Sequence, residues 1–543
     1  MSTNISKAKR EELLKQVAEI RNKLMEHQDE NTNQLLVYLS NIEKDINGKK
    51  YGLVFEEHRE SVDELLENNV PVLIEDESLK IDNGGQQNFL IEGDNLASLK
   101  LLEKTHKGKI DFIYIDPPYN TENKDFVYDD VFVAKEDGFK HSKWLSFMKK
   151  RVEIAHKLLS KKGVIFISID DHEQAQLKLL CDSIFGQDNF IAQIIWERAY
   201  APVNLKKHFS ESHDYVICYA RDIQNAVCNG LPRGIEQNRD YKNPDNDPRG
   251  LWKAGNPSVG PAVEKNIYEI ISPTGRKMLP PSGRSWLYTK ERFEEMLKDN
   301  RIYWGKDGNS IWAPKMFLSE VKQGVTPMTI WKYTEVGHSQ DATKELKAIF
   351  DGESKFTYPK SIRLIQRIVG LYGNKNSTIL DFFAGSGTTG HAVMKLNAED
   401  GGKRKFILCT NNENNICRDV TYERIKRVIE KEDYKASLKY YKVDFVPITE
   451  QVYYEYADKL LLHIKELVEI ENGLDFDGNK KVAICLTDED LQEFTSSLGD
   501  TTTYKAVYVG HDVFVTPEIE TKLNTLGIKI NIIPDYYYGE LRG

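Results

Sequence analysis

Two kinds of hydrophobic pattern alternate along most of this chain. Short runs of β-branched and aromatic residues, such as IDFIYI at 110–115, are typical of buried strands, and longer stretches with apolar residues every three or four positions are typical of helices. From Phe89 onward the order is strand, helix, strand, in the segments NFLIEGDN, NLASLKLLEKTH and KIDFIYID. This alternation predicts an α/β fold with a parallel sheet flanked by helices.

The alternation of strands and helices continues, stops and later resumes. A helix from Lys143 to Leu159, the strand VIFISIDD, the helix EQAQLKLLCDSIF and a strand pair in AQIIWER and DYVICYA carry it to about residue 220. Between about 221 and 335, Gly, Pro, Asn and Asp are frequent and five tryptophans are scattered. The alternation then returns in SIRLIQRIVGLYG, STILDFF, GHAVMKLN and KFILCT. We therefore expect a separate domain inserted into the α/β domain.

The two ends of the chain have patterns of their own. Residues 7–47 place apolar side chains at helical spacing among many charges, which predicts one or two amphipathic helices packed on the chain's own body or on a partner. After residue 448 the helix QVYYEYADKLLLHIKELVEI precedes strands such as KVAICL and KAVYVG. The predicted domains are an N-terminal helical region (1–48), the α/β domain in two halves (49–220 and 336–446), the insert (221–335) and a C-terminal α+β domain (447–543).

The composition is that of an ordinary soluble protein, with 40% apolar and 29% charged residues. No apolar run approaches the roughly 20 residues that span a bilayer, and the first residues lack the apolar core of a signal peptide. We expect a cytoplasmic protein without membrane contact. The six cysteines are scattered without a C-x-x-C pair, so neither a zinc site nor a disulfide framework is predicted, and we expect no metal.

The net charge of −10 is unevenly distributed along the chain. Residues 200–335 contain 20 Lys and Arg against 16 Asp and Glu, an excess of four positive charges in a chain that is otherwise acidic. The middle of the chain is therefore the one region with a cationic bias.

A glycine-rich turn follows the strand STILDFF. The segment Ala384-Gly385-Ser386-Gly387-Thr388-Thr389 opens a helix, and its two glycines tolerate positive φ and carry no side chain, so a small polar cofactor could lie against its backbone. The alternative is an ordinary connection between a strand and a helix. The segment lacks both the phosphate loop of ATPases and the third glycine of the dinucleotide fingerprint.

A second turn, Asp116-Pro117-Pro118-Tyr119, follows the strand IDFIYI. Two prolines make it stiff, so its carbonyls and side chains point in set directions. A target amino group that donates hydrogen bonds to Asp116 and to a proline carbonyl would turn its lone pair outward, while Tyr119 offers a flat face for stacking. A base inside a duplex must flip out to reach such a pocket. The alternative is a rigid surface loop.

Both turns lie beyond the carboxyl ends of predicted strands, where α/β folds place their chemistry, and we expect Asp116 and Gly385 to lie close together on neighbouring strands. Together they resemble the motifs of the S-adenosylmethionine-dependent amino-methyltransferases of DNA, and more closely those of the modification subunit of type III restriction-modification systems. Similar stretches include DFVYDD at 125–130, WLSFM at 144–148 and IPDYYY at 533–538. The resemblance implies a Rossmann-like methyltransferase sheet, S-adenosyl-L-methionine as cofactor, and a catalytic set of Asp116, Pro117, Pro118 and Tyr119.

The resemblance also implies the cofactor contacts. Asp94 of IEGDN corresponds to the residue near the cofactor adenine, and Lys360 of the YPKS segment belongs to the part that closes over the methionine end. Thr410-Asn411-Asn412-Glu413 stands where the family has a carboxylate or Gln for the ribose, so Glu413 is the candidate there. The full implied set is Asp94, Asn120, Lys360, Asp381, Phe383, Ala384, Gly385, Ser386, Gly387, Thr388, Thr389 and Glu413.

The order of the motifs, with the catalytic turn first, the insert second and the cofactor turn last, is that of the β class, in which the insert is the target-recognition domain. Several basic residues of this region either contact DNA or remain solvated surface charges. They are Lys206, Lys207, Arg249, Lys253, Arg276, Lys277, Arg284 and Arg301. Phe209 and His213 either complete the pocket for the flipped base or serve packing and capping.

The resemblance therefore implies a DNA methyltransferase. Asp before the prolines favours N6 of adenine over N4 of cytosine. The implied partners are double-stranded DNA, a second copy of the chain, which would bind through the N-terminal helices, the C-terminal domain or both, and a restriction subunit with helicase and nuclease activity. The alternatives are an orphan DNA methyltransferase and a subunit that mainly reads DNA and assembles a restriction complex.

Overall fold

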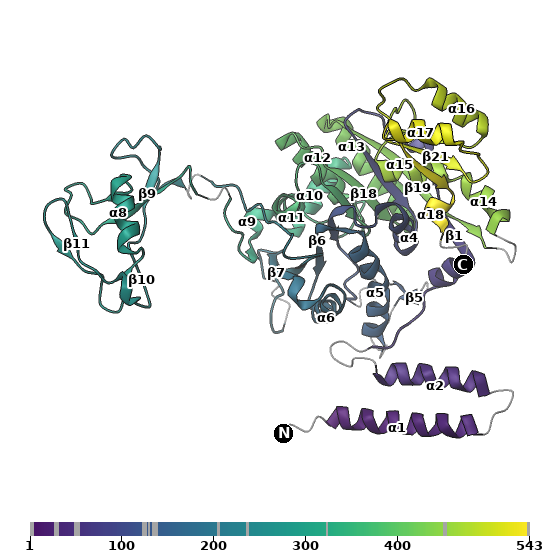
Figure 1. The fold of residues 1–543 in the computed structure, drawn as a ribbon, viewed down its shortest axis with the longest axis horizontal. Helices are drawn as coiled ribbons and strands as arrows, with labels where there is room; N and C mark the ends of the chain where they lie inside the picture. The colour runs from purple at the N-terminus through teal and green to yellow at the C-terminus, as the bar shows by residue number, and fades with distance from the viewer. Residues whose placement is uncertain are drawn as a thin grey trace.

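A large mixed sheet runs through the middle of the molecule (Figure 1). The computed structural model describes residues 5–26, 32–47, 55–121, 127–128, 131–132, 139–202, 207–234, 238–321, 324–448 and 453–539. Within these residues the sheet has ten strands, which lie in the spatial order β1 (Asn69–Glu75), β19 (Ala436–Pro447), β2 (Gln86–Glu92), β18 (Lys405–Thr410), β17 (Thr378–Asp381), β3 (Ile110–Ile115), β6 (Leu159–Ile169), β8 (His213–Ala220), β7 (Phe190–Glu197) and β16 (Ile330–Trp331).

The strands from β19 to β6 in this order are all parallel, which confirms the predicted parallel sheet. β8 is antiparallel to both β6 and β7, so the predicted strand pair is also confirmed. The sheet joins the two halves of the predicted α/β domain, because β17 and β18 of the second half lie between β2 and β3 of the first. The ends of β3 and β17 are therefore neighbours, as expected for the two turns.

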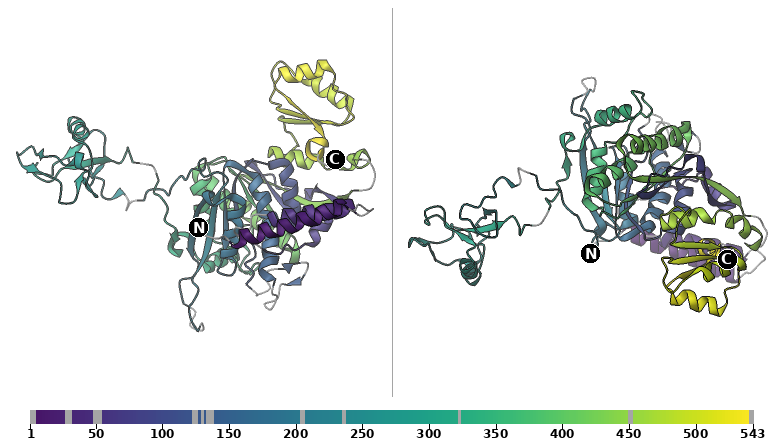
Figure 2. Two further views of the ribbon diagram at one scale, coloured as in Figure 1. Left: turned by 60° about the horizontal axis from the view of Figure 1, so that its bottom comes forward. Right: turned by 90° about the horizontal axis from the view of Figure 1, so that it is seen from above.

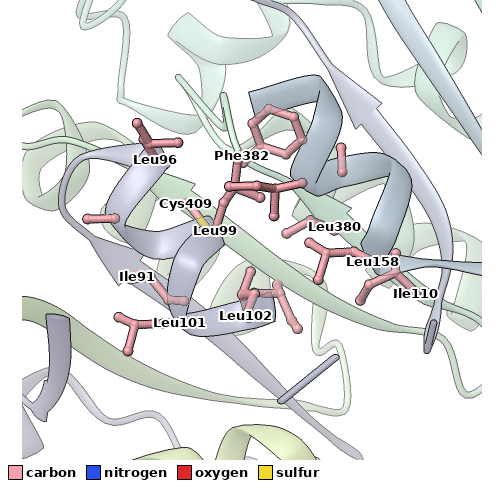
Figure 3. Close-up of a cluster of buried hydrophobic side chains, with 14 of the residues drawn as sticks. Ile91, Leu96, Leu99, Leu101, Leu102, Ile110, Leu158, Leu380, Phe382 and Cys409 are labelled. Carbon is pink, nitrogen blue, oxygen red and sulfur yellow. The ribbon is translucent and has the colours of Figure 1, made fainter. Parts of the chain in front are cut away.

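Helices cover both faces of this sheet and bury its apolar side chains. One face is covered by α4 (Asn95–His106), α5 (Lys140–Leu158), α6 (Gln174–Phe185) and α15 (Ile464–Asn472). The other is covered by α11 (Ile362–Tyr372), α12 (Thr388–Asp400) and α13 (Glu423–Glu432). Figure 3 shows Leu96 and Leu99 of α4 packed beside Phe382 and Leu380 from the second half of the chain. Removal of these side chains from water stabilises the contact between the halves on which the candidate site depends.

The insert forms a small unit of its own. Its elements are β9 (Trp252–Ala254), β10 (Ser258–Val259), η3 (Glu264–Asn266), β11 (Ile270–Ile271), β12 (Lys277–Met278), β13 (Ser285–Trp286), α8 (Lys290–Lys298), β14 (Ile302–Tyr303) and β15 (Ala313–Phe317). They pack around a separate core that contains Trp286, Trp304 and Trp312. In Figure 1 this unit lies to one side of the main body. Its elements span a shorter range than the predicted 221–335, because β16 belongs to the main sheet and pairs with β7. The exact domain boundaries stay predictions.

The C-terminal region differs from the predicted α+β arrangement. β20 (Val482–Cys485), β21 (Ala506–Gly510) and β22 (Lys529–Ile533) form a parallel sheet, connected by α16 (Asp488–Ser497) and α17 (Pro517–Thr525). Strands that alternate with helices in this way are α/β in character, since a parallel connection needs a crossover. Before them lie α14 (Tyr453–Leu461) and α15, and after them α18 (Asp535–Tyr538).

The N-terminal region is a hairpin of two helices, α1 (Ile5–Glu26) and α2 (Thr32–Asn47), below the main body in Figure 1. Val17 and Leu39 are buried in the hairpin, and Arg21 pairs with Glu43 at 2.6 Å. Figure 2 shows this hairpin, the insert and the C-terminal unit at three different places around the sheet. Within the described residues, no helix combines the length and the apolar composition that a membrane crossing requires.

The remaining elements connect these parts. They are α3 (Ser61–Asn68), η1 (Glu77–Leu79), β4 (Val127–Tyr128), β5 (Val131–Phe132), η2 (Gln187–Asn189), α9 (Tyr333–Val336), α10 (Ser339–Ile349), η4 (Glu413–Asn415) and the π-helical turn η5 (Ile416–Tyr422) that leads into α13.

Candidate active site

Asp116 lies directly beyond β3, and two donors occupy its carboxylate. The Tyr119 hydroxyl donates to Asp116 Oδ1 at 2.9 Å, and Lys360 Nζ donates to Oδ2 at 2.6 Å. Lys360 Nζ also lies 4.9 Å from the centroid of the Tyr119 ring, within cation–π range. The side chains of Lys360 and Asp116 are only 11% and 23% exposed. The structure thus brings together the catalytic turn and the segment that precedes α11.

The two proline carbonyls of this turn have different surroundings. The buried Trp144 indole donates to the Pro118 carbonyl at 2.7 Å, which fixes that end of the turn on α5. The Pro117 carbonyl accepts no hydrogen bond from any described residue. Pro117 is therefore the better placed of the two carbonyls for a target amino group.

Asn120 ends the turn in a left-handed conformation, with φ of +59°. Its buried side chain donates to Glu173 Oε1 at 2.6 Å, and His141 Nδ1 lies 2.7 Å from the same oxygen. Glu173 is itself buried, and burial raises its pKa. The Asn120 amide thus joins the end of the turn to the start of α6 and restricts the movement of the turn.

The glycine-rich turn follows β17. Gly385 and Gly387 have φ of +49° and +75°, and a Cβ at Gly385 would lie 3.3 Å from the Phe356 ring. Glycine is required there both by the left-handed backbone and by the close approach of the segment before Lys360. The Thr421 hydroxyl donates to the Gly385 carbonyl at 2.6 Å, which holds the turn against the π-helical segment.

A buried arginine supports the same turn from inside. Arg424 Nη1 donates to the Ser386 carbonyl and hydroxyl, both at 3.1 Å, and to the Thr388 hydroxyl at 2.7 Å. Burial lowers the pKa of Arg424 to about 10. The hydroxyls of Ser386 and Thr388 therefore both bind Arg424. Other predicted residues of this turn also contact the protein itself. Ala384 N donates to Cys409 O at 3.1 Å, and the Phe383 ring lies 5.8 Å from that of Phe147.

The charge of Asp116 acts on three neighbouring groups, Asp381, Asp214 and Tyr119. Asp381 accepts from the Thr389 hydroxyl at 2.5 Å and from Phe383 N at 3.0 Å, yet burial raises its pKa to about 7, with a further contribution from the charge of Asp116. Asp214 at the start of β8 is also buried; desolvation raises its pKa to about 6, while Lys360 lowers it. Burial and the charge of Asp116 raise the pKa of Tyr119 well above its usual value.

The candidates for the adenosine end of the cofactor lie on α4 and beyond β18. Asp94 is the N-cap of α4, where its Oδ1 accepts from Leu96 N at 2.7 Å and Ala97 N at 3.3 Å. Its other oxygen lies 3.6 Å from the buried Arg151. Glu413 is exposed in η4, directly after β18. The roles assigned to Asp94 and Glu413 stay predictions.

The predicted DNA contacts are spread over the insert and its connection. Lys206 lies outside the described residues, and Lys207 and Phe209 are exposed, Phe209 at 89%. Because the Phe209 side chain is exposed, it does not serve core packing, which was one of the two roles expected for it. His213 begins β8, with its ring 5.0 Å from that of Tyr215. Lys253 Nζ lies 5.2 Å from the centroid of the Tyr241 ring.

All four predicted arginines, and Lys277, contact other residues of the insert. Arg249 pairs with Asp247 at 2.9 Å, and Arg301 binds Glu320 through two bonds of 2.6 Å. Arg276 donates to the Asn309 carbonyl, Arg284 to Ser258, and Lys277 pairs with Glu269. Arg249 and Arg301 therefore stabilise the insert through ion pairs within it.

Four residues that support the site were not identified from the sequence: Arg424, Thr421, Glu173 and Asp214. Glu173 and Asp214 follow or begin strands at the same sheet edge as Asp116, so a search of all strand ends for acidic residues would have found them. Arg424 and Thr421 lie more than 30 residues after the turn that they contact, and no spacing rule connects them to it.

Comparison with known proteins identifies the family. The model of the DNA methylase family matches residues 110–421. The StyLTI Mod subunit of a type III restriction-modification enzyme from Salmonella typhimurium is 35% identical over 393 residues, which are 67% of this chain and 59% of that protein. The type II methyltransferase M.KpnI from Klebsiella pneumoniae is 35% identical over 341 residues, 59% of this chain and 79% of that protein. The solved structure of the PvuII DNA methyltransferase (cytosine-N4-specific) aligns with 66% of this chain and 97% of its own, at a TM-score of 0.34 and 10% identity. Because the family model matches more than half of the residues of this chain, the chain belongs to the N6/N4 DNA methylase family.

Proposed function

We propose that this chain is a site-specific DNA methyltransferase that transfers a methyl group from S-adenosyl-L-methionine to N6 of an adenine flipped out of the duplex. The observation that carries the proposal is the meeting of the two turns at neighbouring strands β3 and β17, with Lys360 bound to Asp116 at 2.6 Å. Membership of the DNA methylase family supports methyl transfer to DNA as the reaction.

The glycine-rich turn fits the proposed cofactor. Its backbone at Gly385 and Gly387 adopts conformations that side chains would obstruct, and Phe383 beside it is only partly buried. When bound, S-adenosyl-L-methionine supplies a methyl group that its positively charged sulfur already activates. The residues proposed to hold it are those from Asp381 to Thr389, with Asp94 and Glu413 toward the adenosine end and Asn120 and Lys360 toward the methionine end.

The catalytic turn fits the proposed amine. The lone pair of an exocyclic amine is delocalised into the ring, so the amine becomes a better nucleophile when hydrogen bonds favour a pyramidal nitrogen. Asp116 and the Pro117 carbonyl would accept the two N6 hydrogens, and Tyr119 would stack on the base. Because Trp144 and Asn120 hold the turn in place, little reorganisation is needed when the base arrives.

Substitution of Asp116 tests this assignment. Asp116→Ala should reduce methyl transfer to duplex DNA at least 1000-fold, since the amine loses its acceptor, and should leave the dissociation constant for S-adenosyl-L-methionine within about threefold of the wild type. Transfer is measured with labelled cofactor, and binding by calorimetry. Asp444→Ala, at an exposed position on β19, is the matched control. A large loss of cofactor affinity with normal turnover at saturation would contradict the assignment.

The modified base decides between the two amino-methylation reactions. Nucleoside analysis of DNA after the reaction should show N6-methyladenine. Detection of N4-methylcytosine instead would show that the chain is a DNA amino-methyltransferase whose target base is cytosine, not adenine.

The wider assignment is also a proposal, because the chain spans 59% of the length of the StyLTI Mod subunit and 58% of that of the EcoPI Mod subunit of Escherichia phage P1. We infer that the chain is the modification and recognition subunit of a type III restriction-modification system, acts in the cytoplasm, and pairs with a helicase-nuclease subunit. The alternative is an orphan methyltransferase without such a partner; the type II methyltransferase M.KpnI is as similar to this chain as the StyLTI Mod subunit is, at 35% identity. Co-purification with the product of a neighbouring ATPase-nuclease gene would support the first, and full activity with no such neighbour would support the second.

We further propose that the insert reads the DNA sequence. Lys253, Arg276 and Arg284 of the insert and Lys207 before β8 are the candidate contacts, and their contribution is testable through salt dependence. Substitution of a phosphate contact should reduce the slope of log affinity against log salt by about one.

A further inference from the structure

We propose that Lys360 closes the pocket for the target base while DNA is absent, and that it moves from Asp116 to Asp214 when the base enters. The inference rests on the proposed function of Asp116 and Tyr119 and adds to it a positioning residue and a second acidic group.

Lys360 occupies both features that the target adenine would use. Its ammonium binds Asp116 Oδ2 at 2.6 Å, and the other oxygen of the same carboxylate accepts from Tyr119. The same ammonium lies over the Tyr119 ring, on a face where a base would stack. The Lys360 ammonium thus occupies the positions that the adenine would need: its N–H groups donate to Asp116 as the N6 amine would, and it lies over the Tyr119 ring as the base would. A base that uses this carboxylate oxygen and this ring face cannot enter while Lys360 stays.

The displaced ammonium needs another acceptor, because an unpaired charge in a largely buried site is strongly unfavourable. Asp214 provides one. It is 5% exposed at the start of β8, and its one described ion pair is with Arg198, at 2.7 Å. The next residue, Tyr215, pairs with Ile169 at the end of β6, and β6 lies beside β3, so Asp214 lies at the same edge of the sheet as the turn that begins with Asp116. Movement of Lys360 toward Asp214 would free Asp116 and at the same time compensate the charge of Asp214.

The closing segment also contacts the proposed cofactor turn. Phe356, four residues before Lys360, lies against Gly385, so one short stretch of chain contacts both turns. Rupture of the ion pair between Lys360 and Asp116 has a free-energy cost that binding of the flipped base must offset. Because this cost is the same at every site, the ion pair should lower the flipped fraction at the correct site and at related sites by the same factor.

The test measures base flipping and discrimination in the full-length protein. The target adenine is first located by sequencing modified bases in DNA from cells that express the wild type, and 2-aminopurine is then placed at that position in a duplex. Lys360→Met, which keeps the length and removes the charge, should increase the flipped fraction at least threefold. The ratio of kcat/KM between the correct site and sites with one changed base pair should stay within about twofold of the wild type, because the cost of rupturing the ion pair is common to both.

Three further variants make the result specific. Lys355→Met removes a lysine of the same segment that pairs with the exposed Glu353, and it should behave as the wild type. Asp214→Asn should reduce the flipped fraction at least threefold when Lys360 is present and have no effect on it in the Lys360→Met background. In the DNA-free protein, the melting-temperature changes of Lys360→Met and Asp116→Asn should not be additive in the double variant, since the two residues bind each other.

The opposite results overturn the proposal. A flipped fraction in Lys360→Met that equals or falls below that of the wild type would show that Lys360 does not close the pocket, and an equal effect of Asp214→Asn in both backgrounds would remove the second acceptor. A loss of cofactor affinity in Lys360→Met with an unchanged flipped fraction would leave Lys360 only its proposed role at the methionine end of the cofactor. Failure of the wild type to methylate any DNA would refute the proposed function itself, whereas normal methylation with unchanged flipping in Lys360→Met would refute only this inference.

Discussion

At the scale of single residues, the buried Asp381 makes stability depend on pH. Burial raises its pKa to about 7 from an ordinary value of 3.8, so the folded protein holds the proton more tightly than the unfolded chain does. The stability that this provides is complete below about pH 4 and is lost as the pH rises through about 7; the full difference is about 4 kcal/mol.

Asp381→Asn removes this titration and keeps the shape of the side chain. The free energy of unfolding of the variant relative to the wild type should therefore rise between pH 5 and pH 8, by about 1 to 3 kcal/mol. Chemical denaturation at several pH values measures it. Asp444→Asn, at an exposed position, should show no such trend. A constant difference for Asp381→Asn across this range would mean that the carboxyl group titrates outside it.

Substitution of Arg424 should change stability and cofactor affinity more than substitution of the nearby Arg427. It is 1% exposed and holds the Ser386 carbonyl and two hydroxyls of the cofactor turn. Arg424→Lys leaves several of these groups without partners, at a cost of about 1 to 3 kcal/mol in stability. Because the turn also loosens, the dissociation constant for the cofactor should increase about tenfold in calorimetry. Arg427→Lys, on the next turn of α13 with the partly exposed Glu423 and the exposed Asp351 as partners, should change neither quantity appreciably.

At the scale of elements, a buried ion cluster attaches α15 to the edge of the main sheet. Lys439 of β19 is fully buried and binds Glu469 of α15 at 2.6 Å, Glu75 of β1 at 3.0 Å and Asp475 at 3.1 Å. The Tyr441 hydroxyl donates to the other Glu469 oxygen at 2.7 Å. Three carboxylates around one ammonium are tolerable only while the ammonium is present.

Lys439→Met should therefore lower the free energy of unfolding by about 3 to 5 kcal/mol and increase hydrogen exchange in α15. Lys435→Met, at an exposed position of the same region, should stay within about 0.5 kcal/mol of the wild type. The double variant Lys439→Met with Glu469→Leu should recover part of the loss, because it removes one uncompensated charge. Equal losses in the two lysine variants would contradict this role of the cluster.

The sequence predicted the elements of the main sheet better than it predicted their supports. The periodicity of IDFIYI and STILDFF and the turns after them were sufficient to predict that Asp116 and Gly385 lie near each other, because parallel strands share one edge for their carboxyl ends. The parallel sheet of the C-terminal region was missed, since its short strands are separated by helices with weak apolar patterns. Arg424, Glu173 and the pairing of Lys360 with Asp116 depend on contacts between distant segments, and no local pattern encodes such contacts.

At the scale of the whole molecule, the N-terminal hairpin presents an apolar surface that its own two helices do not cover. The large apolar side chains that lie at helical spacing beside the buried Val17 and Leu39 are 39 to 51% exposed in the described residues: Leu13, Ile20, Leu35, Tyr38 and Ile42. Exposed apolar patches of this kind are typical of interaction surfaces. We propose that two copies of the chain form a homodimer by packing these hairpins together, since the same patch on each copy gives a closed, symmetric contact.

Charges placed in the patch test the dimer. Tyr38→Glu with Ile42→Glu should convert the protein from a dimer to a monomer of 62.5 kDa in light scattering at micromolar concentration, because burial of two new carboxylates opposes association. Asn41→Glu adds a charge at an exposed polar position of the same helix and should leave the dimer intact. Cofactor affinity should be the same in all three proteins, because the hairpin lies outside the proposed pocket. A wild type that is already monomeric at this concentration would refute the homodimer, and a dimer that survives both glutamates would place the contact elsewhere, with the C-terminal unit as the next surface to test.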